Sequence, residues 1–128
     1  MAIIGIGTDL VEASRFRADL VSEKLLLRVF TPAEREYCST QRFPELHLAA
    51  RFAAKEATVK ALSSLYPKLV VSQIEVVRLP SGAGEIHLVR GAASQPPPLL
   101  DADIRLHVSL SHAGWYATAT VVAERVDS

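Results

Sequence analysis

Residues 51–60 read RFAAKEATVK, and this run constrains the fold of the 128-residue chain more than any other segment. Its small and apolar residues favour a helix that packs closely against another element. Four charged residues interrupt them: Arg51, Lys55, Glu56 and Lys60. Like charges four positions apart on a helix, such as Arg51 and Lys55, repel each other by about 0.2–0.5 kcal/mol. We therefore expect a buried helix whose charged side chains serve a phosphate-rich ligand.

Hydrophobic periodicity and turn residues predict the order strand, helices, then four strands. Thr31, Pro32 and Glu34 form a helix start with a capping box. The expected elements are a strand over 3–9, a helical segment over 10–30, a helix from 31 to about 39 or 40, a long helix from 43 to about 63, and strands over 74–79, 85–89, 104–111 and 115–124. This order predicts one α+β domain over residues 1–128, a long helix packed on a mainly antiparallel sheet.

Composition excludes several classes of function. The formal net charge is zero, so we expect no nucleic-acid partner and only a local electrostatic site. No stretch approaches the roughly 20 apolar residues of a membrane span, and the start of the chain lacks the features of a signal peptide. Cys38 is the only cysteine and is interpreted as a structural residue. We expect a cytoplasmic protein without a membrane partner.

Three segments place polar groups where packing or a tight turn is expected. Asp9 ends the first predicted strand, where it could face a cleft or cap a following helix. Glu56 precedes Lys60 by four residues, so this pair is either part of a site or an ordinary salt bridge. Ser111 and His112 lie at the last predicted turn, where they could bind phosphate or be merely structural.

Together these residues predict a magnesium-dependent reaction at a phosphodiester or pyrophosphate. Asp9 and Glu56 supply the few hard oxygen ligands with which Mg²⁺ binds a phosphate ligand while keeping several waters. Arg51 suits planar contacts to phosphate, and Lys55 and Lys60 suit point contacts to a pyrophosphate. Metal and cations would stabilise the departing charge.

The chain resembles the holo-acyl-carrier-protein synthases, the small single-domain 4′-phosphopantetheinyl transferases. The resemblance rests on residues 5–9 (GIGTD), 51–57 (RFAAKEA) followed by Lys60, and 109–112 (SLSH), with support from residues 30–34 (FTPAE). It implies transfer of the phosphopantetheine arm of coenzyme A to a serine of an apo acyl carrier protein, a step of fatty acid biosynthesis. Adenosine 3′,5′-bisphosphate would be the by-product.

The resemblance also implies roles for individual residues. Asp9 and Glu56 would bind Mg²⁺, and Lys60 would contact the coenzyme pyrophosphate. Arg51 and His112 match positions near the nucleotide phosphates, and Arg15 matches a basic residue that grips the acidic carrier. The family forms homotrimers with active sites between subunits. We favour a water activated by the metal, rather than Glu56, as the group that accepts the proton of the carrier serine.

The chain departs from the family pattern in four places. Leu10 supplies no third carboxylate, residues 61–67 replace a glycine-rich loop, residues 82–85 replace a Gly-x-Pro turn, and residues 96–98 (PPP) replace an expected helix. Two alternatives stay open: a non-catalytic coenzyme A or nucleotide-binding module, and a nucleotide pyrophosphatase that needs no carrier. The carrier could be a discrete protein or a domain of a larger synthase.

Overall fold

The structure, a computed structural model, describes residues 1–93 and 95–127. The elements in chain order are β1 (Ala2–Glu12), a 3-10 turn (Ala13–Phe16), α1 (Glu23–Val29), α2 (Pro32–Ser39), α3 (Pro44–Leu62), a second 3-10 turn (Val71–Gln73), β2 (Ile74–Arg78), β3 (Gly84–Leu88), β4 (Ile104–Ala113) and β5 (Tyr116–Arg125). Strands β1, β5 and β4 form an antiparallel sheet in that order, and β2 and β3 form a separate hairpin. The predicted α+β architecture is confirmed.

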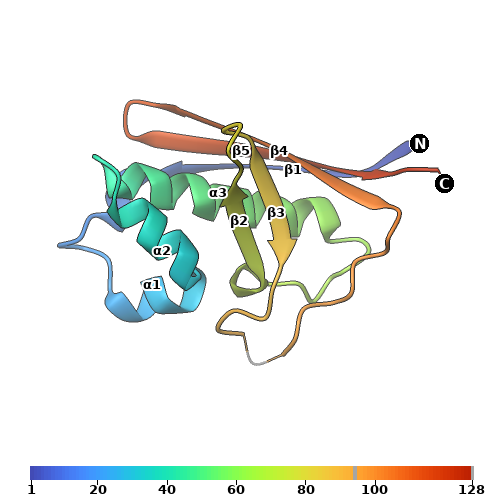
Figure 1. Cartoon of the computed structure of the whole chain (residues 1–128), viewed down its shortest axis with the longest axis horizontal. Coiled ribbons are helices and arrows are strands. Elements are labelled where there is room, and N and C mark those ends of the chain that lie inside the picture. Colours follow the sequence, from blue (N-terminus) through green and yellow to red (C-terminus); the bar gives the residue numbers. More distant parts are fainter. Residues whose placement is uncertain (94, 128) are drawn as a thin grey trace.

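Helix α3 lies along one face of the three-stranded sheet, as Figure 1 shows, and α1 and α2 lie on the far side of α3. The small residues of α3 permit this close packing. A Cβ on Gly7 would lie 1.9 Å from the carbonyl oxygen of Ala57, and one on Gly5 would lie 1.7 Å from that of Ala61. Strand β1 therefore crosses α3 at a separation that only glycine allows.

The predicted helical segment over residues 10–30 is wrong in its first half. Strand β1 continues to Glu12, pairing along its length with β5, and a 3-10 turn follows. Only Glu23–Val29 is α-helical, with Ser22 as its cap. Val11 is buried because it lies on the strand face toward α3, and the strand register thereby overrides the helical spacing.

Residues close together in the sequence account for where the helices start and where the last hairpin turns. Thr31 and Glu34 form the predicted capping box of α2, and α3 spans nearly the predicted range. The last hairpin turns at Gly114, whose φ of +57° fits the first position of a type II′ turn. His112 therefore lies in β4 rather than in the turn. The described residues between β3 and β4, including 96–98, contain no helix or strand.

Candidate active site

One cluster of predicted site residues lies where β1 crosses α3. The Lys60 Nζ donates to the carbonyl oxygen of Thr8 at 2.9 Å and lies 3.4 Å from Asp9 Oδ1. Glu56 lies one helical turn before Lys60 and so faces the same flank of α3. Its half-buried carboxylate has no hydrogen bond or ion pair with any described residue. We call Asp9, Glu56 and Lys60 the carboxylate cluster.

This geometry contradicts both simpler interpretations of these residues. Asp9 lies inside β1, paired with Ala119, so it caps no helix. The ammonium of Lys60 bonds to β1 rather than to Glu56, so the ordinary i,i+4 salt bridge is absent from the described contacts. Asp9 is held by its strand, and Glu56 has no partner in the described part of the chain. Such an arrangement is typical of side chains that bind something else.

The donor set of the carboxylate cluster fits magnesium. No group of three or more His, Cys, Asp or Glu among the described residues could hold a metal ion. A metal with many protein ligands, such as structural zinc, therefore has no site in this part of the chain. Mg²⁺ commonly binds through one or two carboxylates plus waters and substrate phosphates. Asp9 and Glu56 supply that number of carboxylates.

A second group of predicted residues lines a cavity of about 250 Å³ on the other flank of α3. We call it the anion pocket; its lining residues include His47, Arg51, Arg78, Ser111 and His112. Arg51 is only 5% exposed, and its Nε has no hydrogen-bond partner among the described residues. A buried, unsatisfied guanidinium nitrogen is costly unless a ligand completes it. The cavity therefore suits an anion.

Sequence reasoning missed two members of the anion pocket. Arg78 ends β2 and His47 lies in the first turns of α3, and neither shows a motif. Folding brings them beside Arg51 because the β2–β3 hairpin packs against β4 and α3. Burial, with help from the charges of Arg51, Arg78 and His112, lowers the pKa of His47. No local signal could have identified these two side chains.

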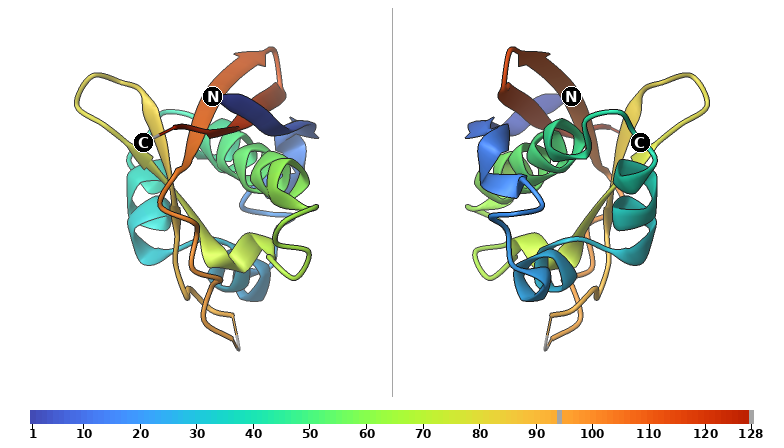
Figure 2. Two further views of the ribbon diagram at one scale, coloured as in Figure 1. Left: turned by 90° about the vertical axis from the view of Figure 1, so that its right-hand side faces the viewer. Right: turned by 90° about the vertical axis from the view of Figure 1, so that its left-hand side faces the viewer.

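The structure thus divides the predicted site between two flanks of α3. Strands β1 and β4 lie at opposite edges of the sheet, with β5 between them (Figure 2). Asp9 comes from β1 and His112 from β4. Arg51 and Glu56 are five residues apart, which is roughly 140° around a helix. Within one chain, the carboxylate cluster and the anion pocket do not share a single cavity.

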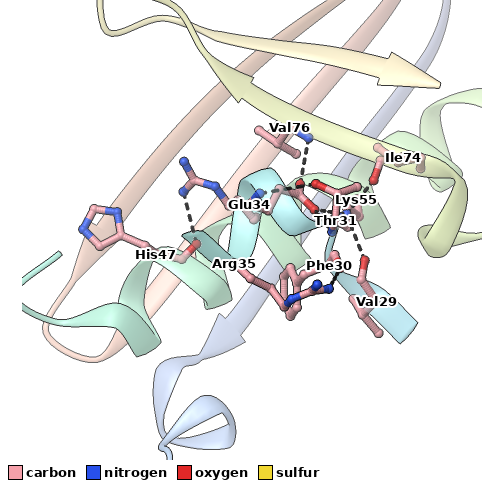
Figure 3. A network of polar contacts seen from close by, with 10 residues as sticks. Val29, Phe30, Thr31, Glu34, Arg35, His47, Lys55, Ile74 and Val76 are labelled. Atoms are coloured by element: carbon pink, nitrogen blue, oxygen red, sulfur yellow. Dashed lines mark hydrogen bonds and ion pairs between the residues drawn. The ribbon is translucent and has the colours of Figure 1, made fainter. Parts of the chain in front are cut away.

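The prediction that Lys55 contacts the coenzyme is wrong. Its side chain is fully buried, and its ammonium donates to Glu34 Oε1 at 2.6 Å and to the carbonyl oxygens of Val29 at 3.0 Å and Ile74 at 2.5 Å. Figure 3 shows this network. An ammonium has three donors, and all three are used. Burial lowers the Lys55 pKa, and the charge of Glu34 opposes that shift.

Arg15 lies in the first 3-10 turn, with its guanidinium carbon 5.3 Å from the centre of the Phe52 ring. The side chain is exposed and pairs with no acidic residue among those described. Because Arg15 lies beyond the end of β1 and is exposed, its guanidinium can contact an acidic partner protein.

Cys38 is buried, and burial raises the pKa of its thiol to about 11. We expect almost no reaction of the native protein with a disulfide reagent near pH 8, because the thiolate is both scarce and inaccessible. Full reaction is expected after unfolding in guanidinium chloride. The absorbance of the thiolate that the reagent releases measures the extent of reaction in the native and in the unfolded protein. Stoichiometric labelling of the native protein within seconds would contradict this burial.

Known proteins resemble the chain over nearly its whole length. The 4′-phosphopantetheinyl transferase superfamily matches residues 5–120. The holo-[acyl-carrier-protein] synthase of Shewanella sp. (strain MR-7) is 41% identical over 127 residues, covering 97% of this chain and 98% of the relative. That of Syntrophotalea carbinolica is 42% identical over 125 residues, covering 94% of each.

Solved structures of acyl carrier protein synthases also resemble the chain over nearly its whole length. The acyl carrier protein synthase of Mycobacterium tuberculosis has a TM-score of 0.70 and 34% identity, covering 98% of this chain and 100% of that one. The coenzyme A complex of the synthase from Chronobacterium ammoniagenes has a TM-score of 0.74 and 31% identity, covering 99% and 100%. The fold, the three motif segments and these similarities agree that the chain belongs to the 4′-phosphopantetheinyl transferase superfamily, among the holo-acyl-carrier-protein synthases.

Proposed function

We propose that this protein transfers the 4′-phosphopantetheine arm of coenzyme A to a serine of an apo acyl carrier protein. The observation that carries the proposal is the carboxylate cluster, in which the Glu56 carboxylate has no hydrogen bond or ion pair with any residue that the structure describes. Relatives at about 40% identity are named holo-[acyl-carrier-protein] synthase, and a structural neighbour holds coenzyme A. In the alternative of a non-catalytic binding module Glu56 and Lys60 would form a salt bridge, whereas the ammonium of Lys60 bonds to β1.

In this reaction the serine hydroxyl of the carrier gives its proton to a water, and its oxygen attacks the β-phosphorus of the coenzyme pyrophosphate. The bond from that phosphorus to the bridging oxygen breaks, and adenosine 3′,5′-bisphosphate leaves. Asp9 and Glu56 would hold Mg²⁺, and the bound ion would supply charge stabilisation for the reaction. Lys60 contacts the pyrophosphate, while Arg51, Ser111 and His112 bind the nucleotide end. Positioning and charge stabilisation account for most of the catalysis in phosphoryl transfer.

The first test is transfer itself. Incubation with coenzyme A, Mg²⁺ and an apo carrier is expected to add one phosphopantetheine arm to the carrier, as measured by mass spectrometry. Glu56→Gln should lower the rate by about 100-fold or more, because it removes a metal ligand charge. Glu36→Gln, an exposed site on α2, is the matched control.

Two outcomes would contradict the proposal. Loss of coenzyme A without a carrier would indicate the pyrophosphatase alternative. Coenzyme binding that is insensitive to Mg²⁺, with no mass gain on several apo carriers, would indicate the non-catalytic module. The carrier panel should include discrete carriers and carrier domains of larger synthases.

We further propose that the protein is a homotrimer in which each active site combines the carboxylate cluster of one subunit with the anion pocket of the next. The separation of the two groups by α3 supports this, because a complete site needs both. The sheet face turned away from α3 also carries exposed Ile6 and Leu10, each 64% exposed. An apolar face of this kind is typical of an interface.

Subunit mixing tests the shared site. Chains carrying Glu56→Gln and chains carrying Arg51→Gln with His112→Ala are each expected to be inactive. Co-assembled at equal amounts, they should recover about a quarter of wild-type activity, because one site in four would join two intact halves. Recovery of no activity in mixed trimers would place both halves in one chain. Sedimentation gives the oligomeric state independently, and Ile6→Asp should yield smaller species.

Arg15 is proposed to hold the acidic carrier. Exposed Leu20 and Leu27 lie on the segment that follows it and would give the carrier an apolar surface beside the charge of Arg15. Arg17 on the same segment is paired with Asp19 at 3.0 Å and adds no free charge. Arg15→Glu should raise the KM for the carrier by about tenfold and leave the KM for coenzyme A unchanged, because it places like charges across the contact. Steady-state kinetics with each substrate varied in turn measure this difference. An equal change in both constants would contradict a docking role.

The proposed function also includes a single domain and a cytoplasmic location. Residues 1–128 are proposed to form one transferase domain, since the superfamily match spans most of them. A buried, free cysteine is compatible with the reducing cytoplasm in which we place the protein. No helix in the described part of the chain is long and apolar enough to cross a membrane.

A further inference from the structure

Lys60 contacts two oxygens of β1 at once. Its ammonium donates to the carbonyl oxygen of Thr8 at 2.9 Å and lies 3.4 Å from Asp9 Oδ1. Strand β1 is at the edge of its sheet, so a carbonyl that points away from β5 needs a donor from outside the sheet. Lys60 supplies that donor to Thr8 and thereby brings its charge to Asp9. The ammonium lies against a carboxylate oxygen that the proposed function assigns to Mg²⁺.

Asp9 is the fixed member of this contact, and Lys60 is the movable one. Asp9 pairs with Ala119, and the hydroxyl of Thr118 donates to the Asp9 carbonyl oxygen at 2.9 Å. The Lys60 side chain is 52% exposed and ends a flexible four-carbon stem. A half-exposed ion pair at 3.4 Å is weak, so little energy is needed to break it. A rearrangement of the contact is therefore expected at Lys60.

The charges beside Asp9 disfavour a metal ion that binds without a phosphate. Asp9 and Glu56 carry two negative charges between them, and the ammonium of Lys60 offsets one of these. A divalent cation on Asp9 Oδ1 would share that oxygen with the ammonium. Like charges this close repel each other, and the half-buried carboxylates weaken the screening by water and salt. A bound metal ion and the observed position of Lys60 therefore oppose each other.

We propose that Lys60 competes with Mg²⁺ for Asp9 and leaves Asp9 when the pyrophosphate of the coenzyme binds its ammonium. This inference rests on the proposed function, which supplies both the metal and the pyrophosphate. Charge-assisted hydrogen bonds to phosphate oxygens are about 2.7–2.9 Å long, so a pyrophosphate is a better acceptor than the more distant Asp9. Movement of the ammonium to that acceptor releases the Asp9 carboxylate.

The competition makes Lys60 an element with two positions that couples two ligands. With its ammonium on Asp9 and Thr8, the carboxylate cluster binds Mg²⁺ weakly. With its ammonium on the pyrophosphate, both carboxylates of the cluster are free for the metal. The two ligands differ in their affinity for these two positions, so each should tighten the binding of the other by the same factor. The metal site is then complete only when the coenzyme is bound.

Calorimetric titration of the full chain with Mg²⁺, with and without saturating coenzyme A, measures this coupling. The heat of Mg²⁺ added to coenzyme A alone is subtracted. In the wild type, coenzyme A should tighten Mg²⁺ binding by about 10- to 100-fold. Lys60→Gln removes the competing charge, so Mg²⁺ without coenzyme should bind about tenfold more tightly than to the wild type. The gain from coenzyme A should fall by about the same factor.

Three further variants separate competition from other effects of the substitution. Lys60→Arg keeps the charge and should keep both the weak binding of Mg²⁺ alone and the coupling. Lys24→Gln removes an exposed lysine of α1 and is the matched control, which should behave as the wild type. Thr118→Val loses the hydroxyl that holds Asp9, so Mg²⁺ should bind about threefold more weakly with and without coenzyme while the coupling stays.

The outcomes distinguish this inference from the proposed function. Equal or weaker binding of Mg²⁺ alone to Lys60→Gln, compared with the wild type, would overturn the competition. Tighter binding with undiminished coupling would overturn the movement of Lys60 to the pyrophosphate. Coupling that depends on Lys60, together with no transfer to any apo carrier, would support the competition and overturn the proposed function.

Discussion

Lys55→Met is expected to lower the free energy of unfolding by about 3–5 kcal/mol, because it leaves the carboxylate of Glu34 buried without its countercharge. Glu34 also accepts the backbone N–H groups of Thr31 at 2.9 Å and Val76 at 2.8 Å. The pair thereby joins α2, α3 and β2, and its loss affects all three. A domain of this size has a total stability of roughly 5–15 kcal/mol, so the variant should be close to unfolding.

Urea denaturation at a fixed protein concentration measures this change. The double variant Lys55→Met with Glu34→Gln should be more stable than Lys55→Met alone, because no unpaired charge remains buried. Lys60→Met, at an exposed site on the same helix, should change stability by only about 0.5 kcal/mol. Equal stability of the Lys55→Met and wild-type proteins would contradict the buried pair.

Gly7→Ala should destabilise the protein by more than the roughly 1–3 kcal/mol typical of an overpacked core. The added Cβ would lie 1.9 Å from the Ala57 carbonyl oxygen, and backbone atoms cannot rotate away as a side chain can. Strand β1 and helix α3 must then separate, which also displaces Asp9 from Lys60. Thermal unfolding and the transfer assay should both register the change.

Gly84→Ala is the matched control. Its Cβ would meet only a methyl group of Val108, at 3.1 Å, which can shift. We expect a small effect on stability there. Similar destabilisation by Gly7→Ala and Gly84→Ala would contradict the close crossing of β1 over α3.

Local chemistry made much of the fold predictable. The capping box of α2, the small-residue pattern of α3 and the turn at Gly114 each depend on residues close in sequence. Residues 10–30 could not be assigned in the same way. Their apolar spacing is compatible with a helix, and only pairing with β5 extends β1 through Val11. Strand register is a long-range property, so a single segment does not reveal it.

The same distinction applies to the site. Residues 51–60 indicated a helix with charges directed at a phosphate-rich ligand. Lys60 does lie 3.4 Å from Asp9, and Glu56 lies one helical turn before Lys60 on the same flank of α3. Lys55 was misassigned because its acid is Glu34, 21 positions away, rather than a neighbour on the helix. An ion pair across elements leaves no trace in local spacing. Its burial makes Lys55 a structural residue.

By itself the sequence determined most of the elements outside residues 10–30, the family resemblance and the residue types that can bind magnesium and phosphate, because these depend on composition and short-range spacing. Only the tertiary structure decided which charged groups meet. It paired Lys55 with Glu34, placed Arg51 with His47 and Arg78 around Tyr37, and separated that pocket from Asp9 and Glu56. The physical reason is that packing brings side chains from distant segments into one low-dielectric environment, where charge interactions are strongest.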